Sequence, residues 1–137
     1  MLRQIIINAD DFGCTPGVSQ GILEAHLNGI VTSTSVMVNM PTAEQWVKTA
    51  LEEALDLGLG LHLNLTTGRP VSRLKDVEGL VDADGVFYPK RELLDRLPTI
   101  DPAYVERELL AQVARFEQIT GRLPDHLDSH HHITYMS

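Results

Sequence analysis

Residues 5–13 read Ile5-Ile6-Ile7-Asn8-Ala9-Asp10-Asp11-Phe12-Gly13. An apolar run without alternation, followed at once by polar residues and a glycine, is typical of a short strand buried on both faces of a parallel sheet. Such sheets place their chemistry just beyond the carboxyl ends of the strands, which is where Asp10 and Asp11 stand. Because successive strand side chains point to opposite faces, both carboxylates can serve one site only where the strand becomes irregular. The stretch predicts a strand that ends in a site, although Asp11 fits a cap of the next helix equally well.

The rest of the chain alternates strands and helices. Further strands are predicted over 30–39, 57–66 and 126–131, and helices over 16–28, 42–54, 90–97 and 102–120. Thr15, Thr42 and Asp101 mark three of the helix starts, Thr42 as part of a capping box. This order indicates an α/β fold with a parallel sheet. A complete (β/α)₈ barrel needs about 250 residues, so residues 1–137 are predicted to form one domain, a parallel (β/α) barrel-like fold equal to roughly the first half of a TIM-like barrel.

Leucine alternates with other residues along the strand predicted over 57–66. Its leucines share one face, and His62 and Asn64 share the other, which in a barrel points toward the lumen. The irregular segment 67–88 follows, with a small hairpin predicted at Asp84-Gly85. A long insertion after a strand is usually functional or disordered, and this one is expected to lie over the mouth of the site.

The composition is that of an ordinary globular protein, with 43% hydrophobic and 22% charged residues and a formal net charge of -8. This acidic balance argues against nucleic acid and anionic membrane surfaces as partners. The chain has no apolar run of transmembrane length and no secretory signal at its start, and its single cysteine, Cys14, allows no internal disulfide. We therefore expect a cytoplasmic protein that binds neither nucleic acid nor membranes.

Asp10 and Asp11 end the first predicted strand, His62 lies in the third and His130 follows the fourth. A barrel would bring these three places to one rim. Two imidazoles and one carboxylate, with coordination positions left open, are the ligands of catalytic divalent-metal sites. A second carboxylate held off the metal can take a proton from water. This pattern indicates a metal-dependent hydrolase, with no residue assigned to an organic cofactor.

Each of these residues also fits a structural role. His62 between leucines can be a core histidine with its hydrogen bonds satisfied, and the run from His130 to His132 can be solvated surface. Asp128 can orient a histidine from outside the metal site. Spacing alone leaves these alternatives open.

Four segments together resemble the YdjC-like carbohydrate deacetylases, whose best-known members deacetylate chitooligosaccharides: NADDFG (8–13), IVTSTSVMVN (30–39), GLHLNLTTGRP (60–70) and PDHLDSHHH (124–132). The resemblance implies that Asp11, His62 and His130 bind the metal and that Asp10 activates water. The implied reaction is hydrolysis of an N-acetyl group on a small β-1,4-linked glucosamine oligosaccharide, which releases acetate. It implies one divalent ion, magnesium or zinc. The two histidines suit zinc, cobalt or nickel better than magnesium on ligand grounds, so the metal stays open.

This chain departs from the family pattern in two places. Thr134 replaces the last histidine of the family's HLDSHxHVH motif, and family members are about twice as long. A lone half-barrel would expose a sheet edge and an inner face, so we expect a homo-oligomer, or a truncated and inactive product. Two alternative functions stay open: a half-barrel that binds metal or sugar without turnover, and a metal-dependent phosphoesterase.

Overall fold

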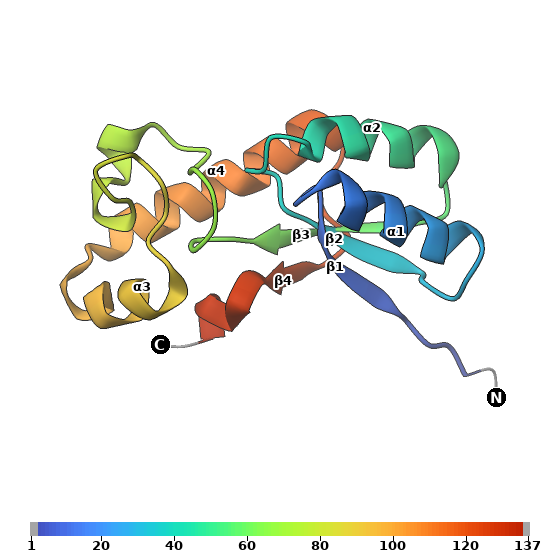
Figure 1. The fold of residues 1–137 in the computed structure, drawn as a ribbon, viewed down its shortest axis with the longest axis horizontal. Helices are drawn as coiled ribbons and strands as arrows, with labels where there is room; N and C mark the ends of the chain where they lie inside the picture. Colours follow the sequence, from blue (N-terminus) through green and yellow to red (C-terminus); the bar gives the residue numbers. More distant parts are fainter. Residues whose placement is uncertain (1–2, 136–137) are drawn as a thin grey trace.

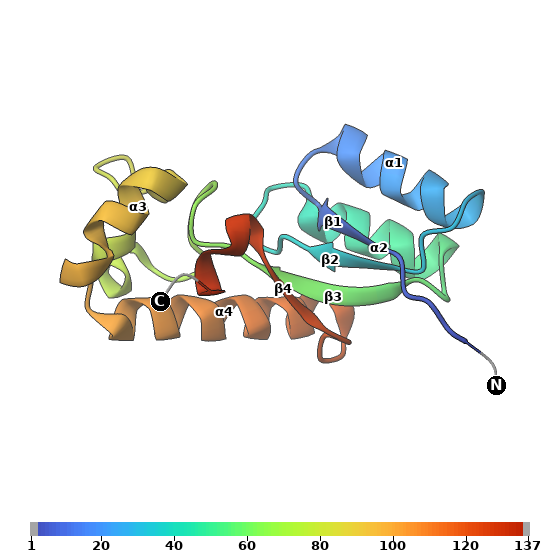
Figure 2. The ribbon, with the colours of Figure 1, turned by 90° about the horizontal axis from the view of Figure 1, so that it is seen from below.

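The computed structural model describes residues 3–135, which form a curved four-stranded parallel sheet with helices along its outer side (Figure 1). The strands lie in chain order: β1 (Asn8–Phe12), β2 (Ser33–Val36), β3 (Gly58–Leu63) and β4 (Leu127–Ser129). The α-helices are α1 (Pro16–Leu27), α2 (Ala43–Glu53), α3 (Lys90–Arg96) and α4 (Pro102–Thr120). A 3₁₀ segment, η4 (His130–Tyr135), follows β4, and Figure 2 shows it near the carboxyl ends of the strands. All strand pairs are parallel, so the predicted α/β half-barrel is confirmed.

The main core lies between the sheet and helices α1, α2 and α4. Its buried side chains include Phe12, Val36, Val47, Leu59, Leu61 and Phe116. The predicted alternation along β3 is confirmed, because Leu59 and Leu61 enter this core while His62 faces the polar side chains of the inner surface. Gly60 shares the inner face with His62, and a Cβ there would overlap the ring of His126 beside β4. The inner face is thus lined by polar groups rather than by a second apolar layer.

The prediction of a buried strand at Ile5-Ile6-Ile7 was wrong. Ile5 and Ile6 are 76% and 78% exposed, and β1 begins only at Asn8. The first backbone hydrogen bonds between this segment and its neighbour join Ile7 O to the amides of Thr32 and Ser33. Because β2 itself starts at Ser33, the residues before Ile7 extend past the end of the neighbouring strand and nothing in the described chain covers them.

Two of the three predicted helix caps form as expected. Thr15 Oγ1 accepts from the Val18 amide at 3.3 Å to start α1, and the Asp101 carboxylate accepts from the Ala103 amide at 2.9 Å to start α4. The capping box at Thr42 was wrong, because its hydroxyl instead donates to Gly13 O at 2.8 Å. That hydrogen bond ties the start of α2 to the turn after β1.

The insertion between β3 and α4 contains α3 and three 3₁₀ turns: η1 (Leu74–Asp76), η2 (Glu78–Leu80) and η3 (Leu97–Thr99). The predicted hairpin is confirmed, since Val81 and Phe87 form an antiparallel bridge and Gly85 takes a φ of 73°. A second core cluster holds the insertion together and consists of Leu65, Val77, Leu80, Val81, Phe87, Leu93 and Ile133. Because Ile133 belongs to η4, the insertion packs against the segment that carries His130.

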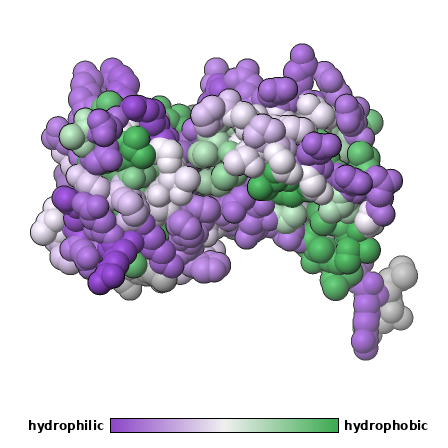
Figure 3. All heavy atoms as spheres, viewed as in Figure 1, coloured by the Kyte–Doolittle hydropathy of each residue, from purple (hydrophilic) through white to green (hydrophobic). Residues whose placement is uncertain are grey.

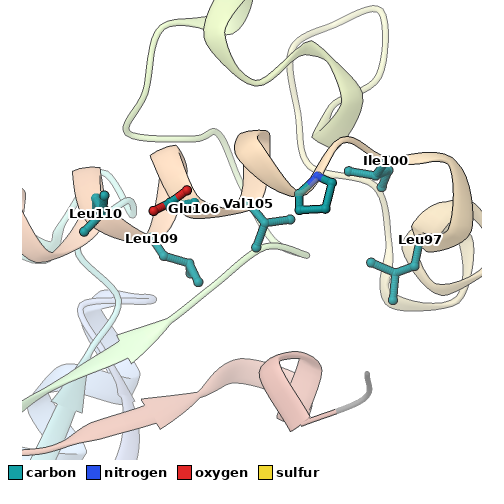
Figure 4. A pocket seen from close by; sticks show the side chains of 7 residues that line it. Leu97, Ile100, Val105, Glu106, Leu109 and Leu110 are labelled. Atoms are coloured by element: carbon teal, nitrogen blue, oxygen red, sulfur yellow. The ribbon is translucent and has the colours of Figure 1, made fainter.

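Several large apolar side chains of the described residues are exposed, and two areas of apolar surface bear on the fold. Figure 3 shows one area beside the N-terminal segment, the region of Ile5 and Ile6. The other is a hollow of about 510 Å³ between η3 and α4, lined by side chains that include Ile100, Val105 and Leu109 (Figure 4). No helix in the part of the chain that the structure describes is both long and apolar enough to cross a membrane.

Candidate functional site

Asp11, His62 and His130 meet at the carboxyl ends of the strands. Asp11 Oδ1 lies 2.9 Å from His130 Nδ1 and 3.2 Å from His62 Nε2, and the two ring nitrogens are 3.3 Å apart. His62 is only 3% exposed, and its ring stands nearly edge-on to that of His130, with the ring centroids 5.3 Å apart. The structure therefore brings together all three residues that the sequence placed in the metal site.

A break in strand register explains how two adjacent aspartates come to face this region. Ala9 pairs with Thr34 and Phe12 with Val36, so Asp10 and Asp11 together stand opposite the single residue between Thr34 and Val36. This is a β-bulge, a device that re-aims side chains near active sites. Asp11 also has a φ of 69°, a strained backbone conformation for a residue other than glycine. The expected irregularity at the end of the first strand is present.

The two imidazoles set the electrostatics of Asp11. The hydrogen bond with His130 first, and the contact with His62 second, hold the pKa of the Asp11 carboxyl well below its usual range, against the opposing effect of partial burial. Asp11 is thus a carboxylate across the neutral pH range. A charged oxygen beside two ring nitrogens is an arrangement suited to a cation.

The far nitrogen of each imidazole has a hydroxyl partner. His62 Nδ1 lies 3.0 Å from Ser35 Oγ, and His130 Nε2 lies 3.2 Å from Thr67 Oγ1. Metal-binding histidines commonly use their second nitrogen in this way, which fixes the ring and its tautomer. The donor set of one carboxylate oxygen and two imidazole nitrogens therefore fits a divalent ion of the zinc type.

Asp10 lies beside this cluster rather than in it. Its Oδ1 accepts hydrogen bonds from Asn8 Nδ2 at 2.8 Å and from Ser35 Oγ at 3.3 Å. Asn8 Nδ2 is also 3.0 Å from Asp128 Oδ2, so one amide group spans both carboxylates. Asp10, His62 and Asp128 form a second group with ligand atoms close to one another. Asp128 lies 3.5 Å from His126 Nε2, which makes His126 its histidine partner.

The histidine run divides between site and surface. His130 is part of the cluster, whereas His131 and His132 are exposed and both take positive φ angles, 56° and 57°. His131 Nδ1 lies 3.0 Å from Thr66 Oγ1, and burial, followed by the neighbouring charge of His130, lowers its pKa. The alternative of a fully solvated run therefore fits His132 but not His130.

A buried polar network that the sequence did not reveal holds the loop after β3. Asn64 Oδ1 accepts from the amides of Thr66 and Thr67, which fixes the residue that contacts His130. Gln112 of α4 accepts from Asn64 N at 3.0 Å and donates to Asn64 O at 2.6 Å. Glu108, one turn earlier in α4, is fully buried beside Gln112. The sequence signal for this network was the pair Glu108 and Gln112, two polar residues four positions apart on the buried side of α4.

A model of the YdjC-like protein family matches residues 4–136 of this chain. The chain is 47% identical over 133 residues to a carbohydrate deacetylase of Geobacillus stearothermophilus, covering 97% of this chain and 51% of the relative. It is 45% identical over 129 residues to a carbohydrate deacetylase of Vibrio cholerae, covering 94% and 49%. The chain thus spans about half the length of the curated relatives it matches.

A solved structure from Enterococcus faecalis V583, of a protein assigned to cellobiose-phosphate cleavage, is also similar. It matches with a TM-score of 0.85 and 41% identity over 92% of this chain and 48% of that chain.

Proposed function

We propose, since the chain belongs to the YdjC-like family, that it carries the metal-binding part of a carbohydrate deacetylase site. The reaction is hydrolysis of N-acetyl groups on chitooligosaccharides or related N-acetylated sugars, with release of acetate. The observation that carries the proposal is the convergence of Asp11 Oδ1, His62 Nε2 and His130 Nδ1 within 3.3 Å. The deacetylase names of the curated relatives support the reaction class.

The chain's own residues take two roles in this proposal. Asp11, His62 and His130 hold the ion, which when bound would polarise the acetyl carbonyl and make water more acidic. Asp10 takes a proton from the attacking water at Oδ2, because both of its hydrogen bonds described above go to Oδ1. Asp10 is exposed, so substrate and water can reach it.

The identity of the ion is a separate proposal. Magnesium prefers oxygen ligands and near-octahedral geometry, whereas imidazole suits zinc, cobalt and nickel. Two of the three ligand atoms here are imidazole nitrogens. We therefore propose zinc rather than magnesium as the bound ion, and both ions are tried in the test.

The test is acetate release from diacetylchitobiose by the purified chain, first stripped of metal and then resupplied with Mg²⁺, Zn²⁺, Co²⁺ or Ni²⁺. The proposal predicts release that metal restores and that His62→Ala abolishes. His26→Ala is the control, because His26 lies in α1 and bonds to Val31 O and Asp56, outside the cluster. Metal-restored release that survives His62→Ala would contradict the proposed site.

One observation favours a phosphoesterase as a second candidate. Such enzymes often use two metal ions, and the group formed by Asp10, His62 and Asp128 offers a second set of ligand atoms. Two bound ions per chain, with phosphate released from a phosphomonoester and no acetate, would support it. One bound ion with neither product would instead support a half-barrel that binds without turnover.

We also propose that the chain self-associates and acts in the cytoplasm. β1 and β4 are the outer strands of the described sheet, and each pairs on one side only. Unpaired strand edges are ready sites for pairing with another chain. Sedimentation velocity is expected to show a dimer or larger species; a monomer at all concentrations, with well-dispersed amide NMR signals, would refute it.

A further inference from the structure

We infer that Ser35 is a positioning residue that fixes His62 as the tautomer protonated at Nδ1, so that Nε2 faces Asp11 and His130 with its lone pair free. This inference rests on the proposed metal site. It assigns a function to a residue of β2 that is not among the proposed metal ligands.

Burial leaves Ser35 and His62 few other partners. Ser35 is fully buried and His62 is 3% exposed, so water cannot readily replace the hydrogen bond between Ser35 Oγ and His62 Nδ1. The length of this contact, 3.0 Å, is that of a normal hydrogen bond. Ser35 stands opposite the bulge formed by Asp10 and Asp11, which brings its hydroxyl close to the Asp10 carboxylate as well.

The direction of the protons follows from the carboxylate. An ionised aspartate can only accept hydrogen bonds, so the Ser35 hydroxyl donates to Asp10 Oδ1, 3.3 Å away. A hydroxyl has one proton, and Ser35 Oγ can then only accept from His62. The proton on His62 must therefore be on Nδ1, and the Nε2 of the neutral ring carries a lone pair.

This tautomer has a consequence for the cluster. His62 Nε2 and Asp11 Oδ1 are then two acceptors 3.2 Å apart, with the Nδ1 proton of His130 as the hydrogen available between them. Metal ligation requires a neutral imidazole with a free lone pair. The hydrogen bonds from Asp10 through Ser35 to His62 thus leave Nε2 free to bind a cation in the metal-free protein.

The first test reads the tautomer in the metal-free chain. Long-range ¹H–¹⁵N NMR spectra at pH 8, assigned with His62→Asn, should show a protonated Nδ1 and an unprotonated Nε2 in wild type. In Ser35→Ala the ring should shift toward the Nε2-protonated form, and Ser35→Thr, which keeps the hydroxyl, should restore the wild-type pattern. A wild-type ring protonated at Nε2 alone, or a Ser35→Ala ring unchanged from wild type, would overturn the inference.

The second test measures zinc affinity by competition with a chelating dye. Loss of a group that orients a metal-binding histidine typically costs about 10- to 100-fold in affinity, which is the loss expected for Ser35→Ala. Ser33→Ala is the matched control: Ser33 lies on the same face of β2 but bonds to Asn8 Oδ1, which His126 also contacts. Ser33→Ala should bind zinc as wild type does, and an equal loss in both variants would refute a specific role. If wild type shows the expected tautomer but binds no zinc, the proposed metal function fails and the tautomer control by Ser35 stands.

Discussion

Glu108 lies inside α4 with its side chain fully buried, and its replacement by glutamine tests how the insertion after β3 is held. Glu108 Oε1 accepts from the Val71 amide at 3.0 Å and from Gln112 Nε2 at 2.8 Å, while Oε2 accepts from the Ser72 amide at 2.9 Å. No cation is among these partners, so three N–H groups stabilise the carboxylate. A buried acidic group with this environment is expected to be sensitive to loss of even one acceptor.

Glu108→Gln keeps the shape of the side chain but turns one acceptor into a donor. The new glutamine amide does least damage when its nitrogen takes the place of Oε2 and faces the Ser72 backbone N–H. The Ser72 N–H then has no acceptor, and two donors face each other. An unsatisfied buried donor costs about 1–3 kcal/mol, and the two remaining hydrogen bonds lose their charge assistance. Relief from burying a charge offsets part of this. We expect a net loss of about 2 kcal/mol in the free energy of unfolding, or roughly 6–10 °C in Tm for a chain of this size.

The assay is thermal and urea unfolding followed by circular dichroism at one fixed protein concentration, because self-association would shift the apparent stability. Glu106→Gln is the matched control, since Glu106 lies on the same helix, is exposed and undergoes the same change of charge. A surface change of this kind should stay within about 0.5 kcal/mol of wild type. If Glu108→Gln is as stable as Glu106→Gln, the buried network does not hold the insertion as described.

Three further predictions concern the site and the turn after β1. Thr67→Val, which removes the hydroxyl 3.2 Å from His130 Nε2 while keeping the shape, should weaken zinc binding about 10-fold in the dye competition; unchanged affinity would contradict a role for Thr67. Zinc affinity should fall as the pH is lowered from 7.5 to 5.5, because protons compete with the metal for imidazole nitrogens, which must be neutral to bind. A titration showing constant affinity over this range would argue against two histidine ligands. Gly13→Ala should lower the free energy of unfolding by about 2–4 kcal/mol, because Gly13 has a φ of 88° and a Cβ there would lie 2.8 Å from Ala43 Cα. Gly17→Ala in α1 is the control: a Cβ there meets open space, so this change should be neutral or stabilising.

The convergence of the site was predictable because parallel strands end at one edge. Asp11 and His130 are far apart in sequence, yet Asp11 lies near the end of β1 and His130 directly follows β4 of the same sheet. His62 lies on the inner face of β3, which the alternation of leucines defined. Helix starts at Thr15 and Asp101 followed from local hydrogen-bonding chemistry. These features depend on the residues themselves and on general sheet geometry.

Other features depend on neighbours that a sequence pattern does not specify. Ile5 and Ile6 are apolar, but their exposure is set by where β2 begins. Thr42 had a competing acceptor in Gly13 O, which only the packing of α2 against the turn brings close. Ser35 contacts Asp10 because a bulge places two aspartates opposite it, and it contacts His62 because β2 pairs with β3 on its other side. The hydroxyl partners of the two histidines could therefore be identified only from the structure.

The proposed function depends on a single metal site formed by Asp11, His62 and His130. The most direct measurement is the number of zinc ions bound per chain, obtained by equilibrium dialysis with elemental analysis of wild type, Asp11→Ala, His62→Ala and His26→Ala. We predict one ion per chain in wild type and in His26→Ala, and none held at the same zinc concentration in the other two variants. No bound ion in folded wild type, or one ion that both Asp11→Ala and His62→Ala retain, would contradict the claim.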